Sequence, residues 1–174
     1  MLGFILLALG VLSRLIVHSP NFTPVIAVAL FGGVYLNRRY AILLPLALMM
    51  ISDVFLGFYD GILYTWLSVV LVSAIGLLVK RSKNVTTILT GTLASALLFF
   101  VISNFGVWAS GYYGFTSQGF WNCYVAAIPF FRNTFVSTLV YGVVLFGIYE
   151  LVALRVKGTR LAPVLLKNDS LTSL

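Results

Sequence analysis

Long apolar runs alternate with short polar segments along this chain. Six runs stand out, over about 2–17, 24–36, 40–58, 62–79, 85–108 and 123–154. Both alternate positions within each run are apolar, which favours membrane helices over the strands of an outer-membrane barrel. A transmembrane helix needs about 20 apolar residues, so the second run is short for one. The pattern predicts an all-α membrane protein: a single six-helix transmembrane domain over 1–154, followed by a polar cytoplasmic tail over 155–174.

Composition narrows the class further. Of the 174 residues, 61% are hydrophobic. Only 9% are charged, against about 25% in an average soluble domain. A chain of this size cannot hide so much apolar surface in one soluble core. Soluble enzymes, disordered tails and collagen-like chains are therefore excluded. Because Cys123 is the only cysteine, an internal disulfide scaffold is excluded as well.

The formal charge of +7 would suggest a nucleic-acid partner in a soluble protein. Here the basic residues follow the turns, and we expect no nucleic acid. Turns 18–22, 59–61 and 109–122 carry no Lys or Arg. The other turns and the tail carry nine basic residues: Arg38, Arg39, Lys80, Arg81, Lys83, Arg155, Lys157, Arg160 and Lys167. The positive-inside rule then places both termini in the cytoplasm.

Polar residues inside the runs gather in the outer half of the predicted bundle. Arg14, Asp53, Asn104 and Arg132 lie there, with Trp108 nearby. His18, Asn21, Asn122 and Cys123 lie at the outer rim. Such residues normally face the bundle interior or a wet cavity. The pattern favours a pocket open to the outside, between the first, third, fifth and sixth helices. A purely structural ion pair between Asp53 and one arginine is the alternative, although it leaves the second arginine unmatched.

Turn 109–122 is long and rich in aromatic residues and glycine. Aromatic side chains cluster in and around it: Trp108, Tyr112, Tyr113, Phe115, Phe120, Trp121 and Tyr124. Two interpretations remain open, an interfacial aromatic belt and a lid that closes over a flat ligand. A bare connection needs only a few residues, so the length of the turn favours the lid.

No motif predicts catalysis or a cofactor in this chain. The single histidine lacks metal-ligand spacing to Cys123 or any carboxylate. There is no phosphate-binding glycine loop and no ATPase motif. We therefore expect no catalytic residue, no metal and no cofactor, and any active transport needs an external engine or an ion gradient. Gly32 and Gly33 indicate close helix packing.

Several motifs resemble those of a bacterial family of small, uncharacterised membrane proteins described as putative transport proteins. They are Arg14 with 18–25 (HSPNFTPV), 29–33 (ALFGG), Ser52-Asp53, 103–108 (SNFGVW) and 126–134 (AAIPFFRNT). That family is similar to the S (substrate-binding) components of energy-coupling factor (ECF) vitamin transporters. The resemblance covers about residues 10 to 150. It implies a six-helix bundle with an outward pocket, which delivers vitamins or metals by toppling against a separate membrane subunit driven by ATPases.

The resemblance also implies a set of site residues. The family's polar motif positions match Arg14, His18, Asn21, Asp53, Asn104, Trp108, Arg132 and Asn133. One feature departs from many S components, which carry an alanine-x-x-x-alanine packing motif in the first helix. Here Gly3, Ala8 and Gly10 lack that spacing. Solitary operation without the shared ECF module therefore remains an alternative.

These observations predict a multi-pass protein of the bacterial inner membrane that binds a small vitamin-like solute for uptake. Trp108 and Tyr112 would stack on the ligand, while Arg14, Asp53, Asn104 and Arg132 would fix its polar groups. Paired arginines suit an anionic or zwitterionic ligand, and the aromatics suit a heterocycle. Two alternatives remain: an intramembrane enzyme on a lipid-linked substrate, using Asp53, His18 and Arg132, and an assembly partner of a larger membrane complex.

Overall fold

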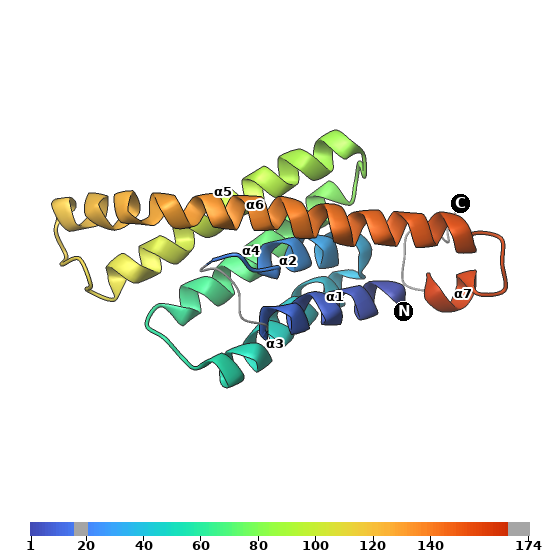
Figure 1. Ribbon diagram of the computed structural model, residues 1–174, viewed down its shortest axis with the longest axis horizontal. Helices are drawn as coiled ribbons and strands as arrows, with labels where there is room; N and C mark the ends of the chain where they lie inside the picture. The colour runs from blue at the N-terminus through green and yellow to red at the C-terminus, as the bar shows by residue number, and fades with distance from the viewer. Residues whose placement is uncertain (16–20, 167–174) are drawn as a thin grey trace.

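The computed structural model describes residues 1–15 and 21–166, and over these residues the chain is helical with no strand. Figure 1 shows the arrangement of the helices. In chain order the elements are α1 (Leu2–Leu12), the short 3-10 helix η1 (Ser13–Leu15), α2 (Val25–Tyr35), α3 (Arg38–Leu56), α4 (Ile62–Val79), α5 (Val85–Ala109), α6 (Ser117–Val156) and α7 (Ala162–Leu165).

Four helices, α3 to α6, are long and apolar enough to cross a membrane. Their outward faces carry large apolar side chains such as Phe55, Leu63 and Val143, which are 75%, 68% and 69% exposed. A soluble protein rarely exposes apolar surface on this scale. The prediction of an all-helical protein is thus confirmed, and the four helices fit a multi-pass membrane bundle.

The first two helices are shorter than a membrane span. Helix α1 and η1 together cover Leu2–Leu15, about 20 Å at about 1.5 Å per residue. Helix α2 has 11 residues, or about 16 Å. The hydrocarbon core of a bilayer is about 30 Å thick. The count of six full spans therefore stays a prediction. Pro24 occupies the cap position before α2, without a side-chain hydrogen bond.

Helix α2 lies at the centre of the bundle, and every one of its residues is buried. It contacts α1, α3, α4, α5 and α6. Its short length is tolerated at membrane depth, because the other helices separate it from lipid. The core of the protein therefore forms around α2.

Glycine allows α2 to approach α4 closely. A Cβ atom added at Gly33 would lie 2.3 Å from the Ser73 carbonyl oxygen and 2.6 Å from the Gly76 Cα. A Cβ added at Gly76 would lie 2.4 Å from the Leu30 carbonyl oxygen. The two helices thus pack backbone against backbone, as small residues permit in membrane bundles. The prediction of close packing is confirmed for Gly33.

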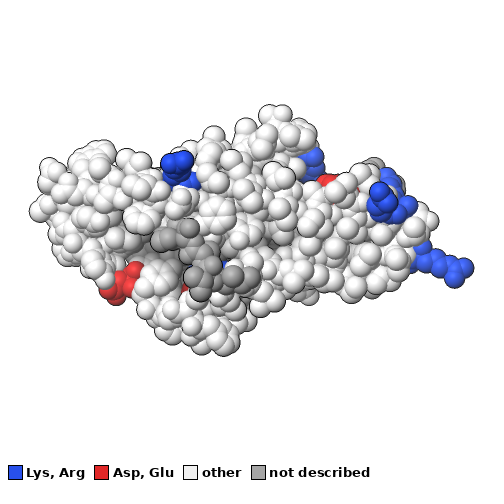
Figure 2. All heavy atoms as spheres, in the orientation of Figure 1, with Lys and Arg blue, Asp and Glu red and all other residues white. Residues whose placement is uncertain are grey.

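The turns separate to two ends of the molecule. Turns 57–61 and 110–116 lie at one end, on the left in Figure 1, whereas the α4–α5 turn, the N-terminus and the end of α6 lie at the other. Basic side chains gather at the end where α6 finishes, as Figure 2 shows. The charge asymmetry of the sequence is therefore a property of the folded bundle.

The segment after α6 folds back toward the start of the chain. The Met1 amino group donates a hydrogen bond to the Leu165 carbonyl oxygen at 2.9 Å. Leu166 is buried in the apolar core. The expected domain boundary at residue 154 falls two residues before the end of α6 at Val156. Ala162, Leu165 and Leu166 therefore pack against the bundle, while residues 157–161 are exposed.

Candidate functional site

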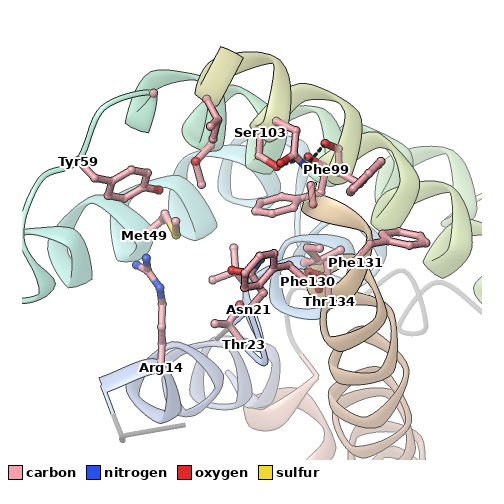
Figure 3. A pocket seen from close by; sticks show the side chains of 18 of the residues that line it. Arg14, Asn21, Thr23, Met49, Tyr59, Phe99, Ser103, Phe130, Phe131 and Thr134 are labelled. Atoms are coloured by element: carbon pink, nitrogen blue, oxygen red, sulfur yellow. Dashed lines mark hydrogen bonds between the residues drawn. The ribbon is translucent and has the colours of Figure 1, made fainter. Parts of the chain in front are cut away.

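A cavity of about 330 Å³ lies at the end of the bundle that carries turn 57–61, just beyond the start of α2. Figure 3 shows its wall. The lining residues come from η1, the segment before α2 and helices α2 to α6: Arg14, Asn21, Thr23, Val25, Ile26, Met49, Tyr59, Asp60, Gly61, Thr65, Phe99, Phe100, Ser103, Asn104, Val107, Ala127, Phe130, Phe131 and Thr134.

Helix length explains why a cavity forms here. Helix η1 ends at Leu15 and α2 begins only at Val25, while α3 to α6 continue toward this end. The four long helices thus extend past the central helix, and Val25 and Ile26 at the start of α2 line the cavity. The space that a longer α2 would fill remains open.

A buried ion pair lies beside the cavity. The Arg14 Nη1 atom is 2.7 Å from Asp53 Oδ1, and the two side chains are 11% and 0% exposed. Arg14 Nη1 also donates a hydrogen bond to Ser52 Oγ, which in turn donates to the Met49 carbonyl oxygen at 2.8 Å. Arg14 lines the cavity, whereas Asp53 lies behind it. The pair therefore holds η1 against α3 and presents one guanidinium to the cavity.

Trp66 completes the environment of the carboxyl group. Its indole Nε1 donates a hydrogen bond to Asp53 Oδ2 at 2.7 Å. Among the described residues, Asp53 Oδ1 has the ion pair with Arg14 but no aligned hydrogen bond. A buried charge is costly unless it is paired and hydrogen-bonded. Arg14 and Trp66 therefore fix Asp53, and with it the junction of η1, α3 and α4.

Helices α5 and α6 supply a polar stripe to the opposite wall. Ser103 Oγ donates to the Phe99 carbonyl oxygen at 2.7 Å, and the Asn104 amide donates to the Phe100 carbonyl oxygen at 2.7 Å. Thr134 Oγ1 donates to the Phe130 carbonyl oxygen at 3.0 Å. Hydroxyl and amide oxygens keep lone pairs when their hydrogens are used in this way. This wall therefore offers hydrogen-bond acceptors.

Aromatic rings make up much of the remaining wall. Phe99 and Phe100 of α5, Phe130 and Phe131 of α6, and Tyr59 all line the cavity. Figure 3 labels Tyr59, Phe99, Phe130 and Phe131 among the residues that line it. The Phe100 and Phe131 ring centroids are 4.9 Å apart, so the two helices also pack through them. The wall combines apolar rings with a few polar groups, as ligand pockets commonly do.

Tyr59 lies in the turn between α3 and α4. Partial burial raises the pKa of its hydroxyl above the usual 10.0, and nearby Asp53 raises it further. The hydrogen bond with Thr65 and the charge of Arg14 lower the pKa, but burial outweighs both. Tyr59 therefore presents a neutral hydroxyl to the cavity at physiological pH.

The structure gathers some of the predicted site residues and separates others. Arg14, Asn21 and Asn104 line the cavity, and Asp53 contacts Arg14 behind it. Arg132 is exposed, and Tyr112 is 74% exposed. These two and Asn133 are outside the cavity lining. His18 lies outside the described residues.

Trp108 belongs to an aromatic cluster rather than to the cavity wall. Its ring lies 5.5 Å from both Phe105 and Phe120 and 6.1 Å from Phe115, measured between centroids. The Trp108 Nε1 atom is buried with no hydrogen-bond partner among the described residues. Sequence predicted stacking of Trp108 on a ligand, whereas the structure shows it packing within the α5–α6 hairpin.

The long turn expected over 109–122 is shorter in the structure. Helix α6 begins at Ser117, where the Thr116 side chain caps it by accepting a hydrogen bond from the Gly119 amide at 3.0 Å. Only residues 110–116 connect α5 to α6. The side chains of Tyr112 and Phe115 are 74% and 72% exposed. Residues 117–122, which made the expected turn long enough for a lid, form the start of α6 instead.

Several lining residues were not predicted, although a signal for them is present. On α5 the lining positions 100, 103, 104 and 107 follow the i, i+3, i+4, i+7 pattern, and positions 127, 130, 131 and 134 of α6 follow the same pattern. This spacing marks one face of a helix. Arg132 directly follows Phe131, and consecutive helical residues point about 100° apart. The expected depth of Arg132 in the membrane predicts a place in the pocket. In the structure Arg132 lies on a different face of α6 and is outside the cavity lining.

The described residues include no group of three or more His, Cys, Asp or Glu side chains that could hold a metal ion. Cys123 is buried, and its Sγ donates to the Asn104 carbonyl oxygen at 3.4 Å. The site thus consists of a cavity with one ion pair, acceptor oxygens and aromatic rings.

Comparison with protein families matches residues 1–162 to one family model, described as a family of unknown function (DUF6580). Comparisons with curated proteins and with solved structures found no match.

Proposed function

The chain belongs to the DUF6580 family, and we propose that it binds a small, ring-containing, vitamin-like solute in this cavity for uptake into a bacterial cell. The observation that carries the proposal is the cavity of about 330 Å³ inside an otherwise apolar bundle. This volume is within the range of about 300–1,000 Å³ typical of small-molecule sites. Polar and ionisable groups at membrane depth usually mark a ligand or ion pathway.

The distribution of charge supports an outward-facing cavity. The cavity is at the end with turn 57–61, and the basic side chains gather at the opposite end. By the positive-inside rule, the basic end faces the cytoplasm. We therefore place the cavity on the outer side of the bacterial inner membrane, with both termini inside and six membrane-inserted helices.

The proposed role is that of an S-component-like subunit, or of a solitary relative. The size of the chain, its helical bundle and its pocket at one end support this proposal. Delivery of the solute then needs a driving force, either a separate membrane and ATPase module or an ion gradient.

The two alternatives fit the geometry less well. An intramembrane enzyme on a lipid-linked substrate would need Asp53 and Arg132 in one site. Arg132 is exposed and outside the cavity lining, while Asp53 is paired with Arg14. An assembly partner would place the polar residues against another protein, whereas the ion pair and the α5–α6 acceptors face an internal space. Solute binding therefore accounts for more of the arrangement.

Native mass spectrometry of the detergent-purified protein, followed by identification of released small molecules, tests the proposal. Ala127 lines the cavity and is buried, whereas neighbouring Ala126 is exposed. We expect wild type and Ala126→Phe to retain the same small molecule, and Ala127→Phe to lose it because the new ring fills the cavity.

Size-exclusion chromatography confirms that each variant is folded. If Ala127→Phe does not fold, Asn104→Leu replaces it as the cavity variant. A companion protein in place of a small molecule would overturn the proposal, as would equal retention by folded cavity variants. Product formation by the purified protein would favour the enzyme alternative.

A further inference from the structure

We infer that the cavity selects a solute that donates hydrogen bonds and is neutral or positively charged, rather than an anion. This inference rests on the proposed function and specifies the ligand class of the same site. It follows from the charges, the hydrogen-bond directions and the aromatic rings of the cavity wall.

The positive charge at the cavity is already matched. Arg14 is the one basic residue among the described residues that line the cavity, and its guanidinium pairs with Asp53 at 2.7 Å. Arg132, which would have made the cavity electropositive, is exposed and outside the lining. The described wall therefore lacks the second arginine that was expected to suit an anionic or zwitterionic ligand.

A carboxyl group is the unmatched charge of the wall. Asp60 lines the cavity from turn 57–61, and no described residue forms an ion pair with it. With Arg14 and Asp53 cancelling, the described part of the cavity wall carries a net negative charge. Asp60 is exposed, so the repulsion of an anionic solute is moderated by solvent but keeps the same sign.

The polar stripe of α5 and α6 also favours a ligand that donates hydrogen bonds. Ser103, Asn104 and Thr134 spend hydrogens on backbone carbonyl groups of their own helices. The oxygen atoms that remain available accept hydrogen bonds, and among these three side chains only the Asn104 amide keeps an N–H to donate. An amine, ammonium or ring N–H satisfies them, whereas a carboxylate or phosphate brings further acceptors.

The aromatic wall favours the same class of ligand. Tyr59, Phe99, Phe130 and Phe131 surround the space in Figure 3. Aromatic faces attract cations within about 6 Å of the ring centroid and also stack on flat rings. An aromatic ring bearing an ammonium or N–H group thus matches the rings, the acceptor oxygens and Asp60 together.

Three probes that share a phenylethyl scaffold test this inference: 2-phenylethylamine (cation), 2-phenylethanol (neutral) and 3-phenylpropanoate (anion). Saturation-transfer NMR titrations with the detergent-purified protein give their dissociation constants at pH 7. We expect the amine to bind at least about tenfold tighter than the carboxylate, which corresponds to about 1.4 kcal/mol, with the alcohol between them.

Two variants assign the effect to the cavity. Asp60→Asn should weaken the amine about threefold or more, by removing a charge attraction, and leave the alcohol unchanged. Ala127→Phe should weaken all three probes, whereas Ala126→Phe should weaken none. If Ala127→Phe does not fold, Asn104→Leu takes its place.

The outcomes distinguish a wrong ligand class from the absence of solute binding in the cavity. Tighter binding of the carboxylate, or equal binding of all three probes, in a cavity that Ala127→Phe blocks would overturn the ligand class and leave solute binding intact. Binding that the folded cavity variant does not affect, or no binding of any probe to folded wild type, would overturn both.

Discussion

Around α2, at the basic end of the bundle, helices pack closely through small and aromatic residues, whereas at the other end the same long helices enclose the cavity beside Arg14. In the packed end, Gly33 and Gly76 bring two helices into backbone contact. The ring centroids of Tyr35 and Tyr149 are 3.9 Å apart beside Phe31. In the cavity end, the start of α2 borders the open space, and both polar and aromatic side chains line the walls.

The polar groups of the two ends have different surroundings. In the packed end, Lys80 Nζ donates to the Leu36 carbonyl oxygen at 2.8 Å, at the end of α2, and Tyr35 donates to Glu150. These contacts tie helix ends together in the protein. In the cavity end, Arg14 and Asn104 have partners as well, yet both still border open space. The packed end thus supports the fold, whereas the cavity end leaves room for the proposed ligand.

The largest expected effect comes from breaking the packed end. Gly33→Leu places a side chain where the Ser73 carbonyl oxygen and the Gly76 Cα would lie within 2.6 Å of its Cβ. Overpacking commonly costs 1–3 kcal/mol, and backbone atoms cannot move aside, so we expect a loss of about 3 kcal/mol or more. Thermal unfolding in detergent, followed by size-exclusion chromatography, measures it.

Gly142→Ala is the matched control for this substitution. An added Cβ at Gly142 meets no atom within 4 Å, although the residue also lies inside a helix. Alanine favours the helix by about 1 kcal/mol over glycine. The variant should therefore be as stable as wild type or more stable. Equal destabilisation by the two substitutions would contradict the close approach of α2 and α4.

The next largest effect is expected at the ion pair. Asp53→Ala leaves the nearly buried Arg14 guanidinium without its partner, and breaking a buried pair commonly costs about 3–5 kcal/mol. We also expect ligand binding to be abolished, because Arg14 loses the contact that positions it. Thermal unfolding and native mass spectrometry report the two effects separately.

Arg132→Ala serves as the control for Asp53→Ala. Arg132 is exposed and has no place in the cavity wall. Its loss should change neither the stability by more than about 0.5 kcal/mol nor the retained small molecule. Unchanged binding in a folded Asp53→Ala variant would show that the ion pair is structural only.

A smaller effect is expected at the acceptor stripe. Thr134→Val removes one oxygen atom from the cavity wall while keeping the shape of the side chain. A neutral hydrogen bond contributes about 0.5–1.5 kcal/mol, so affinity for 2-phenylethylamine should fall about twofold to tenfold. Thr90→Val is the control, since exposed Thr90 bonds to its own helix at 2.9 Å in the same way. A similar loss in both variants would exclude a direct contact with Thr134.

The smallest effect concerns Tyr59 at high pH. Its pKa is raised in the folded protein, so the unfolded chain loses this proton first as the pH increases. The contribution to stability is present below pH 10 and declines between pH 10 and the raised folded pKa. Tyr59→Phe should therefore lose less thermal stability than wild type across this range. Tyr112→Phe, at an exposed position, is the control and should follow wild type.

Part of the site could be predicted from sequence because polarity in an apolar run is easy to detect. Arg14, Asn21, Asn104 and the buried Asp53 were identified in this way. Depth alone did not tell which face of a helix a residue occupies, and Arg132 was assigned to the pocket for that reason. The regular spacing on α5 and α6 carries this information, but it identifies a shared face only once the neighbouring helix is known.

The sequence by itself determined the helical membrane class, the segregation of basic residues to one end and the need for a small residue at Gly33. These properties depend on the composition and on the order of residues along the chain, both of which can be read from the sequence. Only the tertiary structure decided which arginine pairs with Asp53, that Trp108 packs within the α5–α6 hairpin, and where α1 and α2 stop. The cavity depends on where α2 begins, because it occupies the space beyond the start of this short central helix, between four longer ones.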